Sequence, residues 1–144
     1  MTNTVYVLNG PNLNLLGTRE PEIYGSDTLD DIAGMLEDRA QELGLEVESY
    51  QSNHEGDLID LMHDANAKGA RAIIINAGAY THTSIALYDA AKSIKVPVIE
   101  VHLSDPMKRE EFRHISYIGM AAVAEFKGMG PKGYILALEH AAAL

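Results

Sequence analysis

The sequence predicts an α/β protein in which a parallel sheet of five strands is covered by helices on both faces. Short runs of β-branched or apolar residues alternate along the chain with longer segments whose apolar residues recur at a helical period. This alternation is typical of parallel sheets. The run "RAIIINAG" is apolar without alternation, which indicates a central strand buried on both sides. We therefore predict a flavodoxin-like three-layer sandwich with strand order 2-1-3-4-5.

Five strands and four helices are expected to alternate. The strands are, in chain order, Val5–Asn9, Leu45–Gln51, Ala72–Asn76, Val98–Leu103 and roughly Ala121–Phe126. The helices are Thr28–Leu43, Asp57–Lys68, Ser84–Ser93 and Gly133–Ala143. The first helix has the clearest ends, because Ser26 or Asp27 can cap its N-terminus and Gly44 can end it.

The composition fits one domain spanning residues 1–144, with 47% apolar and 22% charged residues. A net charge of -10 argues against nucleic-acid or anionic-membrane partners, because phosphate groups would be repelled. There is no cysteine, no apolar run of membrane-spanning length and no sign of a signal peptide. A cytoplasmic location is the simplest expectation.

Polar residues collect where the predicted strands end. These positions are Asn9 and Asn12, Ser52–His54, Asn76–His82 and His102–Ser104. Ligands of such sheets bind beyond the carboxyl ends of the strands. This convergence predicts an enzyme or a small-molecule binder. An anionic ligand would need local arginines or backbone amides in so acidic a chain.

Glu100 and His102 share one face of the fourth predicted strand. A carboxylate beside an imidazole fixes its tautomer and favours its protonated form, which suits a general acid. The alternative is a buried pair that only joins the sheet together.

Two further segments could bind an anion. Thr81 or Thr83 in "THTS" precedes a predicted helix, where backbone N–H groups favour negative charge, but either residue could simply be an N-cap. Arg109 and Arg113 are four residues apart and would share a helical face suited to a carboxylate, or would lie on a surface helix paired with neighbouring glutamates.

Tyr24 lies five residues after Arg19 on a loop rich in glycine and proline. One arginine close to a phenol can stabilise the phenolate appreciably, although desolvation opposes it, so further polar groups or a second arginine would be needed. A tyrosinate base is therefore physically attainable. The alternative is a tyrosine that packs on the edge of the sheet.

Two familiar motifs are not supported. "GMGPKG" matches G-x-G-x-x-G, but no second strand with an acidic residue follows it, so we expect a tight turn before the last helix. The six histidines form no H-x-H or H-E-x-x-H pattern, and we predict no metal site.

The segments "NGPNLNLLGTREPEIYG", "QSNHEGDLID", "NAGAYTHTSIAL", "EVHLS", "REEFRHISY" and "GYILAL" occur in this order. Together they resemble type II 3-dehydroquinate dehydratase over essentially the whole chain. The resemblance implies a flavodoxin-like fold and a homo-oligomer, a dodecamer of trimers. It also implies dehydration of 3-dehydroquinate to 3-dehydroshikimate without metal or cofactor, on the shikimate pathway or in quinate breakdown.

The resemblance also implies residue roles. Tyr24 would remove a proton from C2, Arg19 would hold Tyr24 ionised, and Asn12 would help to stabilise the enol or enolate. His102, oriented by Glu100, would protonate the leaving hydroxyl at C1. The remaining implied contacts are Asn76, His82 and Arg113 to substrate hydroxyls, the backbone of Leu103 and Ser104 to the carboxylate, Arg109 near the closed loop, and Asp89 reaching the site of a neighbouring subunit.

Four positions depart from the family's usual pattern: Ala77 where proline is frequent, Tyr88 where arginine is, Asp105 where asparagine is, and Ile115 where histidine is. Asp105 adds a negative charge near the proposed acid. Two alternatives stay open on the sequence: a lyase paralogue for a related polyhydroxy keto acid, and a non-catalytic small-anion-binding module.

Overall fold

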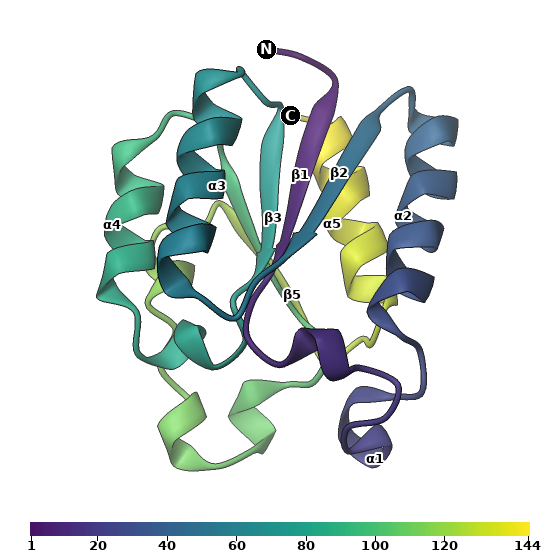
Figure 1. The fold of residues 1–144 in the computed structure, drawn as a ribbon, viewed down its shortest axis with the longest axis vertical. Helices are drawn as coiled ribbons and strands as arrows, with labels where there is room; N and C mark the ends of the chain where they lie inside the picture. The colour runs from purple at the N-terminus through teal and green to yellow at the C-terminus, as the bar shows by residue number, and fades with distance from the viewer.

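The computed structural model describes residues 1–144 and contains one parallel sheet at its centre (Figure 1). The strands are β1 (Thr4–Asn9), β2 (Glu46–Gln51), β3 (Ala72–Asn76), β4 (Val98–His102) and β5 (Ala124–Lys127). Their order is β2-β1-β3-β4-β5, and all four pairings are parallel. The predicted fold class and strand order are confirmed, and β3 is the central strand.

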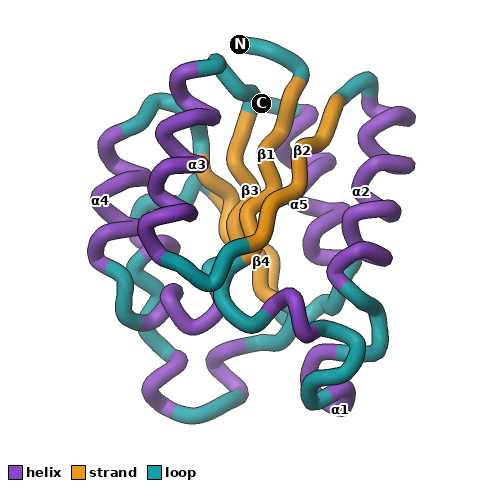
Figure 2. Tube along the Cα trace, viewed as in Figure 1, coloured by secondary structure: helices purple, strands orange, loops and turns teal.

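The sheet lies between two layers of helices (Figures 1 and 2). The helices are α1 (Pro21–Tyr24), α2 (Leu29–Leu43), α3 (Glu55–Ala67), α4 (Ile85–Ser93) and α5 (Lys132–Ala142). The pair α3 and α4 covers one face, and α2 and α5 cover the other. The short α1 stands apart, at the end of the molecule where β1 terminates.

Each face of the sheet has its own apolar core. Along β1, Val5 and Val7 pack toward α2 and α5, while Tyr6 and Leu8 pack toward α3 and α4. All five residues of β3 are buried, as the unbroken apolar run predicts. Because both faces are covered, little but the strand ends remains open to carry polar, reactive side chains.

The helix caps differ in part from the sequence-based prediction. Thr28, rather than Ser26 or Asp27, caps α2: its hydroxyl accepts from the backbone N–H of Asp31, whose carboxylate accepts from the N–H of Thr28. The C-terminus of α2 ends at Gly44 in the left-handed conformation, as predicted.

Ser84 caps α4, so of the two alternatives for Thr81 and Thr83 the N-cap is wrong. The hydroxyl of Thr81 is buried instead, one turn before the helix. It therefore does not cap the helix.

The chain between β4 and β5 also differs from the prediction. It consists of three short 3-10 helices, Pro106–Lys108, Glu111–Arg113 and Ile118–Met120. Arg109 has extended backbone angles, so Arg109 and Arg113 do not share a helical face. The last 3-10 helix ends at Met120, directly before the predicted start of the fifth strand, and the strand itself begins three residues later than predicted, at Ala124.

Candidate active site

A pocket lies at the carboxyl ends of β1, β3 and β4, at the lower end of the molecule in Figure 1. Ten of the twelve predicted site residues line it: Asn12, Arg19, Tyr24, Asn76, His82, His102, Leu103, Ser104, Arg109 and Arg113. Glu100 lies behind His102 and contacts it. Asp89 is exposed on α4 and does not line the pocket, so its role toward another subunit stays a prediction.

The loops that form the pocket pack closely on each other. A Cβ added to Gly10, just after β1, would lie 2.4 Å from the carbonyl oxygen of Ala77, just after β3. Only glycine permits this approach of two backbones. Asn12 then takes a left-handed conformation (φ 70°), and its N–H donates to Oδ1 of Asn53, 3.0 Å away. The strand ends therefore hold Asn12 in place from two sides.

Tyr24 is the last residue of α1 and meets two guanidinium groups. Nη1 of Arg109 donates to its hydroxyl at 2.8 Å. The guanidinium carbons of Arg19 and Arg109 lie 4.9 and 5.1 Å from the centre of its ring. One guanidinium group therefore bonds to the hydroxyl, and both lie close to the aromatic ring. The sequence pointed to Arg19 as the partner, whereas the structure places Arg109 at the hydroxyl itself.

The segment that carries Tyr24 is bounded by glycines with positive φ, Gly17 (94°) and Gly25 (84°). Between them Glu20 also has a positive φ, 39°, at the start of α1. Such conformations are costly for residues with a side chain, and they give this loop its sharp bends.

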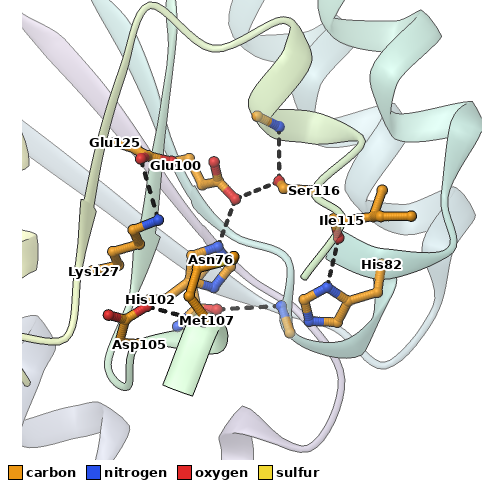
Figure 3. A network of polar contacts seen from close by, with 12 residues as sticks. Asn76, His82, Glu100, His102, Asp105, Met107, Ile115, Ser116, Glu125 and Lys127 are labelled. Atoms are coloured by element: carbon orange, nitrogen blue, oxygen red, sulfur yellow. Dashed lines mark hydrogen bonds and ion pairs between the residues drawn. The ribbon is translucent and has the colours of Figure 1, made fainter. Parts of the chain in front are cut away.

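Glu100 and His102 form a buried pair at the end of β4 (Figure 3). Nε2 of His102 lies 2.5 Å from Oε2 of Glu100. The hydroxyl of Ser116 donates to the same oxygen at 2.5 Å, and the N–H of Gly119 donates to that hydroxyl. This arrangement assigns Nε2 to the carboxylate and leaves Nδ1 as the ring nitrogen that can serve a ligand.

The charge of Glu100 is maintained despite its burial. Burial alone would raise the pKa of Glu100, but the hydrogen bonds from His102 and Ser116 outweigh it, so the pKa lies below its ordinary value. A buried carboxylate that stays ionised stabilises the protonated imidazole beside it. The pair is therefore suited to donating a proton from His102.

His82 has the opposite character. Its Nδ1 lies 2.8 Å from the carbonyl oxygen of Ile115, and because a carbonyl only accepts, Nδ1 carries the proton (Figure 3). Burial lowers the pKa of His82, so the ring is neutral at pH 7. Its Nε2 is then an acceptor, ready for a ligand hydroxyl. Since the backbone of Ile115 makes this contact, the departure from histidine at that position leaves it intact.

The remaining cation of the pocket is Arg113, whose Nε donates to Oε1 of Glu110 at 3.1 Å. With Arg19 and Arg109 it gives the pocket three guanidinium groups in a chain of net charge -10. The local charge therefore suits an anionic ligand.

The turn "GMGPKG" makes backbone hydrogen bonds to the two residues that follow β4. The N–H of Gly128 donates to the carbonyl of Ser104, and that of Gly130 to the carbonyl of Leu103. Both glycines have positive φ, as a tight turn requires. Asp105 turns its carboxylate to the N–H of Met107, 3.0 Å away, and caps the following 3-10 helix.

Sequence reasoning missed two residues that the fold brings to this site, Ser116 and Tyr134. Ser116 bonds to Glu100, and Tyr134 bonds to Asn76 from the far side of the sheet. Both fall in quoted segments, "RHISY" and "GYILAL", but no local spacing signals their partners 16 and 58 residues away. No group of three His, Asp or Glu side chains gathers closely enough to hold a metal ion, and no helix is long and apolar enough to span a membrane.

Residues 3–142 match the family of class II dehydroquinases. A 3-dehydroquinate dehydratase of Rhodopseudomonas palustris (strain BisA53) is 54% identical over 99% of this chain and 95% of its own length. Crystal structures of type II dehydroquinases superpose closely. That from Propionibacterium acnes has a TM-score of 0.95 at 42% identity and covers 100% of this chain and 99% of its own. That from Butyrivibrio crossotus has 0.94 at 45% identity, with 96% of both chains covered. The chain belongs to the class II dehydroquinase family.

Proposed function

We propose that this protein is a hydro-lyase that converts 3-dehydroquinate to 3-dehydroshikimate by anti elimination of water through an enol or enolate intermediate. Family membership supports the reaction. The observation that carries the assignment is the pairing of a phenol flanked by two guanidinium groups with a histidine backed by a buried carboxylate, in one pocket. These are the base and the acid that an elimination next to a ketone requires.

In the first step the phenolate oxygen of Tyr24 takes a proton from C2, next to the substrate carbonyl. The C–H electron pair moves into the ring and the carbonyl oxygen gains negative charge. Asn12, which lines the pocket, assists by stabilising that oxygen through an ordered water. Arg19 and Arg109 hold Tyr24 ionised before the step.

In the second step the electrons return and expel the C1 hydroxyl, which takes a proton from His102 and leaves as water. Glu100 stabilises the imidazolium before the transfer and fixes the ring. Tyr24 then releases its proton to solvent, and His102 takes up a proton from solvent. One water has left the substrate, and the enzyme is restored.

The proposed contacts to the substrate include hydrogen-bond acceptors as well as donors. His82 accepts from a substrate hydroxyl through Nε2, and Asn76 and Arg113 donate. The backbone at Leu103 and Ser104 holds the carboxylate, with the guanidinium groups nearby. The loop with α1 closes over the ligand and excludes water, which strengthens each of these interactions.

We further propose that the protein works as a homo-oligomer built from trimers, up to a dodecamer, in the cytoplasm. The exposed side chains support an assembly: Phe112 is 66% exposed, Met120 64% and Val123 57%. All three lie in the segment between β4 and β5, so this segment is where we expect another subunit to pack. Asp89, on α4, would reach the site of that neighbour.

The test is an absorbance assay of the conjugated enone product after 3-dehydroquinate is mixed with the protein in EDTA. Saturable formation of the enone is expected. Folded, oligomeric protein that gives no product would overturn the proposal. A panel of related polyhydroxy keto acids, run in parallel, would then identify a paralogue, and binding without turnover of any acid would identify a binding module.

A further inference from the structure

A chain of hydrogen bonds runs behind the pocket from the end of β2 to the loop after β3. Tyr134 on α5 is fully buried; its hydroxyl donates to Oδ1 of Asn9 at 2.7 Å and accepts from Nδ2 of Asn76 at 3.0 Å. Nδ2 of Asn9 donates to the carbonyl of Tyr50 at 3.2 Å. Oδ1 of Asn76 accepts from the N–H of Gly78 at 3.2 Å. The chain thus links three strands and α5.

The two backbone ends fix the direction of every bond between them. The carbonyl of Tyr50 can only accept, so Asn9 turns its amino group there and its oxygen toward Tyr134. The N–H of Gly78 can only donate, so Asn76 turns its oxygen there and its amino group toward Tyr134. A hydroxyl, which donates once and accepts as well, is the group that can join the two amides. Reversing either amide would bring two donors or two acceptors together.

The direction of these hydrogen bonds decides which group of the Asn76 amide faces a ligand. Its side chain lines the pocket. One hydrogen of its amino group is used by Tyr134, and its oxygen is used by Gly78, so the second N–H remains for the pocket. If the amide could rotate, donor and acceptor would exchange, and in the rotated orientation the oxygen of Asn76 rather than an N–H would face the substrate.

We infer that Tyr134 is a positioning residue of the active site: together with the N–H of Gly78 it holds the amide of Asn76 so that an N–H donor faces the substrate. This inference rests on the proposed function for the identity of the substrate. Tyr134 does not line the pocket and acts through Asn76 alone. Burial raises the pKa of Tyr134, so its hydroxyl keeps its proton over the whole working range of pH and the chain keeps its direction.

The competing explanation is that the hydroxyl only contributes stability. Tyr6 offers a matched control, because its ring is 1% exposed and its hydroxyl donates to Oδ2 of Asp64 at 2.7 Å, away from the pocket. Tyr134→Phe and Tyr6→Phe each remove one hydroxyl from a buried ring. Both are expected to lower the melting temperature.

Only Tyr134→Phe is expected to change substrate binding. Loss of one oriented hydrogen bond that is made equally in ground and transition states should raise KM about tenfold and leave kcat within about threefold. Tyr6→Phe should keep the wild-type KM. A Tyr134→Phe variant whose KM matches that of Tyr6→Phe overturns the inference.

A double variant separates positioning from stability. Asn9→Leu added to Tyr134→Phe removes the acceptor that lost its donor but also the bond from Asn9 to the carbonyl of Tyr50, so the melting temperature should stay close to that of Tyr134→Phe. Asn76 stays without its partner, so KM should stay raised. Recovery of KM in the double variant would show a purely structural role of Tyr134 and overturn the inference.

One measurement does not depend on turnover. In a crystal structure of Tyr134→Phe the amide of Asn76 is expected to rotate away from Gly78 or to occupy two orientations. An amide that stays in place, with its bond to Gly78 intact, overturns the inference. If the wild-type protein fails to turn over 3-dehydroquinate while the Asn76 amide moves in this variant, the proposed function falls and the positioning role stands.

Discussion

The hydroxyl of Tyr24 shows how the neighbours of one residue set its chemistry. Alone, a tyrosine is a poor base because it is neutral at pH 7. Here Arg109 bonds to the hydroxyl and Arg19 lies over the ring. The structure thus places a second arginine at the phenol, which the sequence argument required beside Arg19.

Tyr24→Phe should therefore lower kcat by at least about 100-fold with little change in KM, because it removes the proton acceptor and keeps the ring. Steady-state kinetics with 3-dehydroquinate measure the effect, and Tyr6→Phe serves as a control for removing a tyrosine hydroxyl elsewhere. Turnover near the wild-type rate would contradict the assignment of Tyr24 as the base.

Asp105 is a second case decided by its neighbours. From the sequence its charge seemed able to disturb the acid and the carboxylate site. The structure directs the carboxylate to the backbone N–H of Met107, where it caps a 3-10 helix. Asparagine caps equally well, so Asp105→Asn should change stability by less than about 0.5 kcal/mol.

The same substitution should leave kcat/KM within about twofold, because the cap and the position of the loop are retained. Asp105→Ala is the matched variant, which loses the cap and should be less stable by about 1 kcal/mol. A large gain in kcat/KM for Asp105→Asn would show that the carboxylate acts on the substrate after all.

Glu100 links one residue to the pH dependence of stability. Its pKa in the folded protein lies below the ordinary value of 4.5, so the folded state favours the ionised form more than the unfolded chain does. The stability that this contributes is present above pH 4.5 and is lost as the pH falls through the lowered pKa. The melting temperature of Glu100→Gln should therefore approach that of wild type as the pH falls below 4.5.

That comparison uses the difference between the two proteins, because Asp31, Asp64 and Glu110 also have lowered pKa values and impose the same trend on both. A difference in melting temperature that stays constant over this range would contradict the assignment. Glu100→Gln should also lower kcat, since a neutral amide does not stabilise the imidazolium of His102.

At the scale of elements, the site depends on loops that approach one another closely. The contact of Gly10 with the carbonyl of Ala77 joins the loop after β1 to the loop after β3. Asn12 follows one of these loops and Asn76 precedes the other, so the distance between the loops sets the width of the pocket.

Gly10→Ala should destabilise the protein by about 1–3 kcal/mol and reduce kcat/KM, because its Cβ forces two backbones apart. Gly34→Ala is the matched control: Gly34 is exposed within α2, and an added Cβ would meet nothing within 4 Å. It should be more stable than wild type by about 0.5–1 kcal/mol, with unchanged activity. Chemical denaturation and kinetics of both variants test the pair, and wild-type stability of Gly10→Ala would contradict the contact.

The whole molecule raises the question of assembly. A 15.7 kDa chain that exposes Phe112, Met120 and Val123 in neighbouring stretches has apolar surface to cover. We expect static light scattering at micromolar concentration to give a mass above that of a dimer. A mass near 15.7 kDa would contradict the proposed oligomer and the role of Asp89 in a neighbouring site.

The sequence by itself determined the fold class, the strand order and most of the residues that line the pocket. Parallel strands need crossover helices, and their carboxyl ends lie at one edge of the sheet. The sequence was therefore enough to predict that residues such as Asn12, Asn76 and His102 lie close together. The family resemblance placed Tyr24 and Arg19 with them. Helix ends were predicted where one residue type dominates, as at Gly44.

Only the tertiary structure decided which side chains touch. Local spacing assigned Arg109 and Arg113 to one helical face, but 3-10 turns separate them and bring Arg109 to Tyr24, 85 residues away. Ser116 and Tyr134 carry no local signal, because their partners come from other strands. Hydrogen bonds between distant elements depend on packing distances of a few tenths of an ångström, and these are set when the sheet and its helices close on each other, not by the order of residues along the chain.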